Sequence, residues 1–293
     1  MQEYSPRLLR EVQQKNLEMA KFFVRFCADN DLLCYFCGGG CIGAVRHQGF
    51  IPWDDDLDFF LPRSDYERLK AVWKDTDQYV LLFPTESYND HCMYITLRDR
   101  TTTMIKPYQV GMDIVHGISM DIFPLDGWPN GRLQRTFQVF NGLVYQLFCA
   151  QVVPEKHGGL TALIGKAALS LIKSPKARYR IWRRAEKRMT KYAIEDCEAI
   201  TEICAGPHYM MKKYPKECFA GAVFLDFEGE KMPVPVGYDT YLRTAFGDYM
   251  QLPPAEKQVP SHDAVVVDTE RPYTEYRDKY LPEADGCAHD RRF

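Results

Sequence analysis

The segment Cys37–Asp58, CGGGCIGAVRHQGFIPWDDDLD, decides the fold of this chain because it combines a glycine run with an acidic run. The glycines Gly38–Gly40 predict a hinge whose backbone N–H groups can approach an anion closely. The residues Cys41–His47 predict a short helix, and the N-terminus of a helix favours negative charge. This half of the segment therefore predicts a place for a phosphate group.

The second half of the segment predicts a metal site on a strand. Asp54, Asp56 and Asp58 are spaced by two, and residues two apart share one face of a strand. Because clustered carboxylates repel one another, we expect a cation between them, and Mg²⁺ prefers a few carboxylates together with phosphate oxygens. The apolar residues Leu57 and Phe59–Leu61 predict a buried strand, on which acids need a counter-ion.

Each run alone has an ordinary structural explanation. A glycine run is typical of a flexible turn, and an acidic run is typical of a solvated loop. Here the two runs lie some fifteen residues apart on either side of a basic pair, Arg46 and His47. This combination favours a binding site over two unrelated loops.

The length and composition indicate a globular protein. The chain has 293 residues, of which 46% are hydrophobic and 26% charged, and its net charge of −3 gives no general attraction to nucleic acid. The polar N-terminus resembles no secretory signal, and no apolar run predicts a transmembrane helix. Ten scattered cysteines favour a reduced cytoplasmic protein. Zinc at Cys34, Cys37 and Cys41 is disfavoured because no second Cys or His pair lies nearby.

Helices and strands are predicted to alternate around this segment. Apolar residues at a spacing near 3.6 predict a helix over 6–30, and Ser64–Glu67 resembles a capping box at the start of another helix. Further strands are predicted over 79–83, 92–98 and 119–123, the last with a single acid, Asp121, in an apolar run. The pattern predicts an α/β (α+β) fold, in which a mixed sheet is flanked by helices.

Residues 131–205 predict a helical insert between a core of residues 1–130 and a C-terminal segment of residues 206–293. Apolar helical stretches over 133–150 and 160–172 precede a Ser174–Pro175 pair, which predicts the start of a long helix. This helix is basic through Lys176, Arg178, Arg180, Arg183, Arg184, Lys187, Arg188 and Lys191. Such a run is typical of a solvated face or of a surface that rests on anionic lipid, whereas few aromatic neighbours disfavour nucleic acid.

The C-terminal segment is predicted to complete the core. Phe227–Pro235 predicts a hairpin, and Asp239–Tyr249 predicts a short helix that ends near Gly247. The polar tail beyond Ser261 is predicted to be loosely held.

These motifs resemble the LicD family of the nucleotidyltransferase-fold superfamily, which also includes the fukutin-type sugar-phosphate transferases. The resemblance rests on GGxxxGAxRHxGFIPWDDDxD up to Asp58, on Arg98–Asp99 with Thr101–Thr103, on SMDIFPLDGWP from Ser119 to Pro129, and on Phe227–Pro254. These blocks follow the family's order over most of the chain. Cys37 and Cys41 replace the more usual Ser and aliphatic residue. The resemblance implies a nucleotidyltransferase-like core with a helical insert.

The resemblance also implies a metal-dependent transferase. The LicD family moves phosphocholine from CDP-choline onto surface glycans such as lipopolysaccharide or teichoic acid, with CMP leaving. Asp56, Asp58 and Asp121 would then hold one or two Mg²⁺ or Mn²⁺ ions, and Asp54 would be a further ligand or support one. Either Asp121 or Asp54 would accept the proton of the acceptor hydroxyl.

Further residues are candidates for the donor. Gly39 and Gly40 are expected to hold the phosphates, with Arg46, His47 and Arg98 as cationic contacts, although His47 fits a structural role equally well. Because a quaternary ammonium donates no hydrogen bonds, choline would need an aromatic surface. The candidate cage residues are Trp53, Tyr94, Tyr108 and Trp128.

Three alternatives stay open beside this interpretation. The same fold can move phosphoethanolamine, a phosphonate, a polyol phosphate or a nucleotidyl group. A non-catalytic nucleotide-binding module is disfavoured by the retained acids, and a Ca²⁺ loop is disfavoured because DDDLD lacks the Gly and the terminal Glu. The expected partners are a CDP-linked donor, a glycan or glycolipid acceptor and, through the basic helix, the inner face of the membrane.

Overall fold

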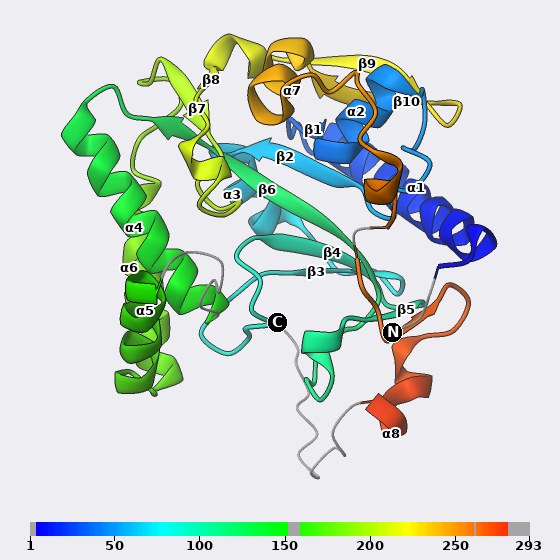
Figure 1. Cartoon of the computed structure of the whole chain (residues 1–293), viewed down its shortest axis with the longest axis horizontal. Coiled ribbons are helices and arrows are strands. Elements are labelled where there is room, and N and C mark those ends of the chain that lie inside the picture. Colours follow the sequence, from blue (N-terminus) through cyan, green and yellow to red (C-terminus); the bar gives the residue numbers. More distant parts are fainter. Residues whose placement is uncertain (1–3, 152–158, 261, 281–293) are drawn as a thin grey trace.

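A mixed β-sheet forms the centre of the molecule (Figure 1). The computed structural model describes residues 4–151, 159–260 and 262–280. The strand order is β1–β2–β6–β4–β3, and β7 and β8 extend the sheet from β6. The strands are β1 (Tyr35–Cys37), β2 (Asp58–Pro62), β3 (Tyr79–Leu82), β4 (Ile95–Asp99), β6 (Ile118–Trp128), β7 (Ala199–Thr201) and β8 (Tyr214–Pro215). Since β2 and β6 are parallel and the other pairs antiparallel, the predicted α/β (α+β) fold is confirmed.

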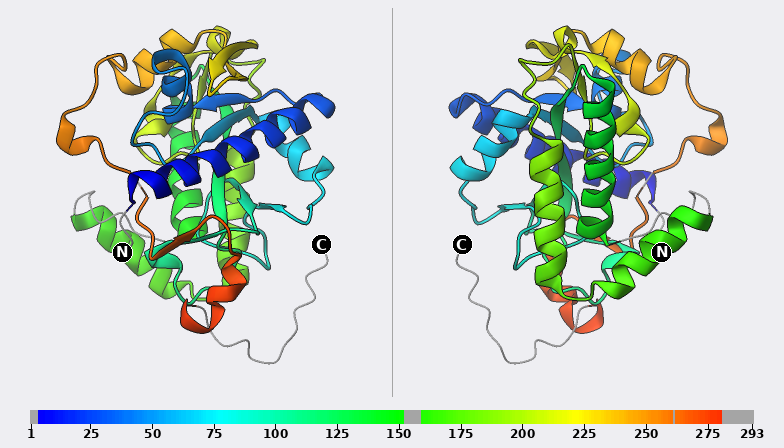
Figure 2. Two further views of the ribbon diagram at one scale, coloured as in Figure 1. Left: turned by 90° about the vertical axis from the view of Figure 1, so that its right-hand side faces the viewer. Right: turned by 90° about the vertical axis from the view of Figure 1, so that its left-hand side faces the viewer.

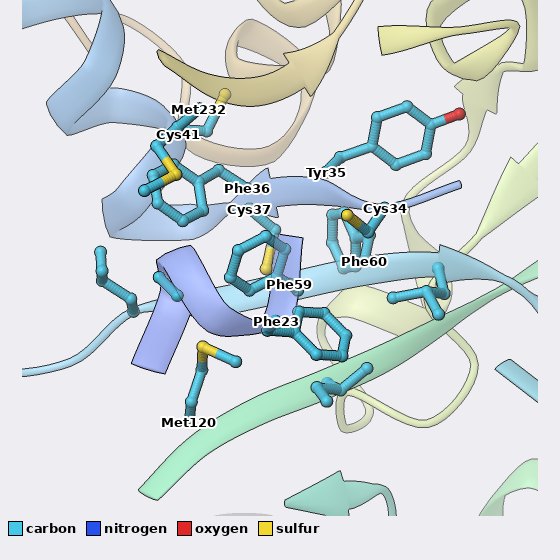
Figure 3. Packing of buried hydrophobic residues seen from close by; sticks show 14 of the residues in the cluster. Phe23, Cys34, Tyr35, Phe36, Cys37, Cys41, Phe59, Phe60, Met120 and Met232 are labelled. Carbon is cyan, nitrogen blue, oxygen red and sulfur yellow. The ribbon is translucent and has the colours of Figure 1, made fainter. Parts of the chain in front are cut away.

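The first helix, α1 (Pro6–Asp29), packs against the sheet and confirms the predicted N-terminal helix. It begins at Ser5, whose side chain accepts a hydrogen bond from a backbone N–H of the first turn. On its buried face the ring of Phe23 lies 5.0 Å from that of Phe59 in β2. Figure 3 shows these rings together with Phe36 in the core. Burial of each such ring stabilises the fold by about 1.5–3 kcal/mol.

The C-terminal half adds the predicted hairpin and short helix. β9 (Ala222–Phe227) pairs with β10 (Glu230–Pro235), and α7 (Tyr238–Phe246) ends at Gly247. The other helices are α2 (Gly38–Arg46), α3 (Arg63–Val72), α4 (Arg132–Ala150), α5 (Gly159–Leu171), α6 (Pro175–Met189) and α8 (Arg277–Tyr280). Short 3₁₀ turns occupy Pro107–Gln109, Tyr209–Met211, Lys216–Phe219, Ala255–Lys257 and Tyr273–Tyr276.

Two boundaries in the segment that decides the fold differ from the prediction. Helix α2 begins at Gly38 rather than at Cys41, so the glycines form its first turn instead of a hinge before it. Gly38 has a φ of 49°, which glycine adopts without a Cβ clash and which lets the chain turn from β1 directly into the helix. Strand β2 begins only at Asp58, so Asp54–Leu57 approach it as an irregular segment.

The C-terminal tail is more ordered than predicted. Val266–Asp268 forms β11, which pairs antiparallel with β5 (Thr103–Ile105). The prediction of a loosely held tail is therefore wrong for this strand, because backbone pairing fixes it to the body. Residues 281–293 lie outside the described residues.

Helices α4 and α6 pack on each other at one side of the molecule, and Figure 2 shows them side by side. The rings of Tyr145 and Trp182 lie 5.8 Å apart in an apolar cluster of their own. The division of the chain into a core, a helical insert and a C-terminal segment stays a prediction. Within the described ranges, no helix has both the length and the apolar character needed to cross a membrane.

Helix α3 begins at Arg63, without the predicted cap from Ser64, because a buried ion pair anchors its first turn. The guanidinium of Arg63 donates two hydrogen bonds to Asp126 of β6, at 2.8 and 2.7 Å, and Asp126 is only 1% exposed. This bidentate contact ties α3 to the strand that also carries Asp121.

We expect Arg63→Met to lower the free energy of unfolding by about 3–5 kcal/mol, because it leaves a buried carboxylate without its partner. The double variant Arg63→Met/Asp126→Leu should recover much of this loss. Urea unfolding followed by circular dichroism measures both effects. A single variant within about 1 kcal/mol of the parent would contradict this account of the ion pair.

Candidate active site

Four carboxylates meet where β2 begins beside β6. The β2–β6 register pairs Phe59 with Ile122, which places Asp58 next to Asp121. The backbone N–H of Asp121 donates to Oδ1 of Asp58 at 3.2 Å. Asp54 and Asp56 come from the irregular segment before β2, and their side chains are hydrogen-bonded to each other.

The electrostatics of this cluster favour a bound cation. Burial, followed by the charges of Asp56 and Asp121, raises the pKa of Asp58 well above its usual value. Burial and the charges of Asp56 and Asp55 raise the pKa of Asp54 to about 8. Such carboxylates ionise together only when a positive charge compensates them. Their oxygens are the ligands that Mg²⁺ and Mn²⁺ prefer, so the residues fit the predicted metal.

The cluster opens into a small cavity between the strands. Its lining consists of Asp55, Asp56, Asp58, Met104, Lys106, Ser119, Asp121 and His262. Three of the four predicted acids therefore face one space, together with a cation and an imidazole. The fourth, Asp54, lies against helix α2 instead: a Cβ at Gly39 would be 2.1 Å from Oδ2 of Asp54. Only glycine at position 39 leaves room for that carboxylate.

Helix α1 holds the acidic segment in place through two buried polar side chains. Nε2 of Gln13 donates to the carbonyl oxygen of Asp54 at 2.9 Å, and Nδ2 of Asn16 donates to that of Asp55 at 3.0 Å. Gln13 is 5% exposed and Asn16 is fully buried. Since buried amides need hydrogen-bond partners, these residues fix the backbone path of the segment.

Sequence reasoning missed Lys106, which follows β5 and lines the cavity. Burial lowers its pKa, but the neighbouring Asp121, Tyr108 and Cys92 together raise the pKa above its usual value. The ammonium of Lys106 makes no hydrogen bond or ion pair with any residue that the structure describes. A lone lysine after a three-residue strand carries no sequence pattern that could have revealed it.

His262 was also missed, because it lies in the tail that was predicted to be loose. Its Nδ1 lies 3.1 Å from Oδ1 of Asp55, and its Nε2 lies 3.6 Å from Oδ2 of Asp56. One ligand atom from each of these three residues lies within 4.8 Å of the others, a spacing that a metal ion could bridge. The pairing of β11 with β5, which no local pattern predicts, brings this histidine to the site.

The predicted cationic contacts, Arg46, His47 and Arg98, do not line the cavity. Arg46 and His47 lie at the opposite end of α2 from Gly39, and the guanidinium of Arg46 donates to the carbonyl oxygens of Tyr249 and Gln251. Arg46 therefore anchors the segment after α7, and its Nε donates to Nδ1 of His47.

Arg98 is buried and uses its donors within the protein. They reach Asp90, the carbonyl oxygen of Val115 and the hydroxyl of Thr96. Because these bonds occupy the guanidinium, Arg98 supports the loops beside the site. Contact of Arg46, His47 or Arg98 with a phosphate stays a prediction.

Of the predicted aromatic residues, Tyr94 is closest to the acids. Its hydroxyl donates to Asp121, and its ring lies 4.3 Å from that of Phe123. Tyr108 follows Lys106 by two residues and is 64% exposed. Trp53 directly precedes Asp54.

Trp128 lies away from this group. It ends β6, seven residues beyond Asp121 and so about 23 Å along the strand. The guanidinium of Arg135 covers its ring at 3.6 Å. Trp128 is therefore separated from Tyr94 and cannot share one cage with it.

Comparison with known proteins finds a family match for the segment that carries this cluster. Residues 32–131 match the family model described as LicD/FKTN/FKRP, nucleotidyltransferase domain. This range is therefore similar to the LicD domain of that model. The chain is also 29% identical over 275 residues to the lipopolysaccharide cholinephosphotransferase LicD of Haemophilus influenzae, which covers 87% of this chain and 96% of that protein. The resemblance inferred from the motifs is thus confirmed.

The LicD domain contains all four predicted acids and Lys106. Among the residues that line the cavity, His262 lies outside the matched range. Gln13 and Asn16, which hold the acidic segment, precede the matched range. The remainder of the chain therefore supports the LicD domain from both sides.

We expect Asp58→Asn to weaken Mn²⁺ binding by more than about tenfold, because even the loss of a group that supports a ligand has such an effect. Asp226→Asn, which changes an exposed carboxylate on β9, serves as the matched control. Titration followed by electron paramagnetic resonance measures free Mn²⁺. Equal affinities in the two variants would remove Asp58 from the metal site.

Proposed function

We propose that this chain transfers a phosphocholine group from a CDP-linked donor to a hydroxyl of a glycan or lipid-linked glycan and releases CMP. The observation that carries the proposal is the half-buried carboxylate cluster of Asp54, Asp56, Asp58 and Asp121 within the range that matches the LicD model. The similarity to a lipopolysaccharide cholinephosphotransferase supports the choice of phosphocholine and of a glycan acceptor.

In this proposal Asp56, Asp58 and Asp121 hold Mg²⁺ or Mn²⁺. When bound, the ion neutralises the phosphate charge and stabilises the leaving CMP. His262 orients Asp56 from the side of the C-terminal segment, and its contact with Asp55 fixes the imidazole in turn. Gln13 and Asn16 keep the backbone of the acidic segment rigid, and such support is what positions ligands accurately.

The acceptor hydroxyl attacks the phosphorus that carries choline. The new bond joins the acceptor oxygen to this phosphorus, and the bond to the bridging oxygen of CMP breaks. Asp121, which faces the cavity, and Asp54, which is hydrogen-bonded to Asp56 beside it, are the two candidate acceptors of the hydroxyl's proton. Asp121 already accepts a hydrogen bond from Tyr94, which reduces its capacity for this task.

Lys106 is proposed to contact the diphosphate of the donor. Its ammonium lines the same cavity as Asp56, Asp58 and Asp121 and has no partner of its own among the described residues. A lysine serves as a point charge for phosphate, so it can take the task first predicted for Arg46, His47 and Arg98. Gly39 and Gly40, in the first turn of α2, remain proposed phosphate contacts through their backbone N–H groups.

The choline group is proposed to rest on Tyr94, Tyr108 and Trp53. Tyr94 and Tyr108 come from segments on either side of β4 and β5, and Tyr108 presents an exposed ring beside Lys106. A quaternary ammonium binds to the faces of such rings through cation–π attraction. The alternative donors, which carry phosphoethanolamine or a polyol phosphate, need no such aromatic surface.

We expect the protein to release CMP from CDP-choline in the presence of Mn²⁺ or Mg²⁺ and a sugar acceptor. Asp56→Asn and Asp58→Asn should reduce this release by about 100-fold or more, because a catalytic metal contributes several kcal/mol to the reaction. Chromatography of the nucleotide products measures the turnover, and circular dichroism confirms the fold of each variant.

A parallel screen separates the alternatives. Turnover of CDP-ethanolamine, CDP-ribitol, CDP-glycerol or a nucleoside triphosphate in place of CDP-choline would change the donor but keep the reaction class. Binding of Mn²⁺ and nucleotide without turnover of any donor would instead favour a non-catalytic module.

We expect Lys106→Ala to lower kcat/KM for the donor by about ten- to 100-fold, the range for loss of a hydrogen bond to a charged group. Lys106→Arg should recover part of the loss. Lys257→Ala, at an exposed position, is the control. A Lys106→Ala variant with unchanged kinetics would exclude its contact with the diphosphate.

The proposed acceptor is a glycan or a lipid-linked glycan. A lipid-linked glycan would present its hydroxyl at the inner face of the membrane, which is the proposed location of this protein. The basic helix α6 is the element first predicted to contact that surface.

A further inference from the structure

The helices α4 and α5 expose large apolar side chains on one side of the molecule. On α4, Leu133 is 87% exposed and Phe140 61%, and on α5, Leu171 is 83% exposed. The full exposed set is Leu133, Phe137, Phe140 and Leu143 on α4 with Leu163, Ile164 and Leu171 on α5. Large exposed apolar groups that cluster on neighbouring elements mark an interaction surface.

A groove runs between α4 and α6 beside these side chains. Phe140, Asn141 and Val144 of α4 line one wall, and Ile172 lies at its end. The opposite wall belongs to α6 and consists of Ala177, Arg180, Ile181, Arg184, Ala185 and Arg188. The groove therefore combines an apolar wall with a positively charged one.

Two sets of arginines on α6 differ in their partners. Arg178 donates to the carbonyl oxygens at the end of α5, and Arg183 pairs with Glu186. These residues serve the packing of the helices.

The second group is Arg180, Arg184 and Arg188, which we call the arginine stripe. These residues are spaced by four along α6, so they lie on one face, and all three are exposed. None of them has an ion-pair partner in the part of the chain that the structure describes. The stripe is therefore a line of uncompensated positive charge along the groove.

We propose that the arginine stripe and the apolar side chains of α4 and α5 dock this protein on an anionic lipid surface. The guanidinium groups would contact lipid phosphates, and the Leu, Phe and Ile side chains would enter the boundary of the acyl region. Helices that combine basic and large apolar side chains in this way lie in the membrane interface.

A second copy of the chain is a poorer occupant of this surface. A two-fold contact through the groove would bring one arginine stripe against another, and like charges in a desolvated interface repel. Nucleic acid is disfavoured as the ligand because its contacts are mainly polar and would leave exposed aliphatic side chains such as Leu133 and Leu171 unexplained. An anionic membrane matches both the charge and the apolar character.

The docking surface is joined to the loop beside the carboxylate cluster. At the end of α4, the carbonyl oxygens of Cys149 and Ala150 are hydrogen-bonded to Asn89 and His91. The hydroxyl of Tyr145 donates to the carbonyl oxygen of Met93, which directly precedes Tyr94. If the proposed function holds, this connection would fix the site relative to the membrane that carries the acceptor. Lipid binding itself does not depend on that function.

The experiment is co-sedimentation of the full chain with vesicles, without donor or metal. We expect binding to vesicles of phosphatidylcholine mixed with phosphatidylglycerol, weaker binding at high salt, and little binding to phosphatidylcholine alone. Arg180→Gln/Arg184→Gln/Arg188→Gln should weaken the partition by about fivefold for each arginine and about 100-fold together. Phe140→Ser/Leu171→Ser should weaken binding at low and high salt alike.

The matched control is Lys74→Gln/Lys257→Gln/Lys279→Gln, which removes the same charge from exposed positions outside the three helices. An equal loss in both triple variants would overturn the proposal, since it would show attraction by net charge alone. So would the absence of vesicle binding, a dimer that the stripe variants dissociate, or binding to heparin without binding to vesicles. Release of CMP with a free sugar as the acceptor of phosphocholine should be unchanged in the stripe variant, which separates this test from that of the proposed function.

Discussion

The mutual repulsion of half-buried carboxylates at the start of β2 is the constraint on which the rest of this structure depends. Asp54, Asp56 and Asp58 cannot be ionised together in a desolvated position unless a cation lies between them. The neighbouring structure keeps them close despite this repulsion. Two amides of α1 hold the backbone, the parallel partner β6 adds Asp121, and the first turn of α2 leaves space for a carboxylate through Gly39.

Much of this arrangement was predictable because it is local in the sequence. The glycine run, the spaced acids and the apolar residues after them occupy one short segment. The alternation expected of a strand does not hold before Asp58, because that stretch is irregular and Asp55 rather than Asp54 lines the cavity. Asp121 was found for the same reason, since a single acid in an apolar run stands out. The predicted helices and most of the strands follow from periodicity, which tertiary packing did not override.

The residues that were missed are those placed by long-range pairing. His262 reaches the cavity through the pairing of β11 with β5, and Lys106 directly follows β5; neither short strand carries a pattern that indicates its partner. Conversely, Arg46 and Arg98 were predicted to bind phosphate because of their type and position in the motif. The structure gives their guanidinium groups other partners, which only the fold can reveal. A charged residue in a motif therefore indicates the region of a binding site more reliably than it indicates a direct contact with the ligand.

The carboxylate cluster is assembled from both ends of the chain, since α1 supplies Gln13 and Asn16 while His262 arrives from the C-terminal side. During synthesis the acidic segment leaves the ribosome long before His262 does. The nascent protein therefore carries its repelling acids for most of translation without the imidazole that faces them. Completion of the site is coupled to completion of the chain, so a product truncated before His262 would lack the imidazole that faces Asp55 and Asp56.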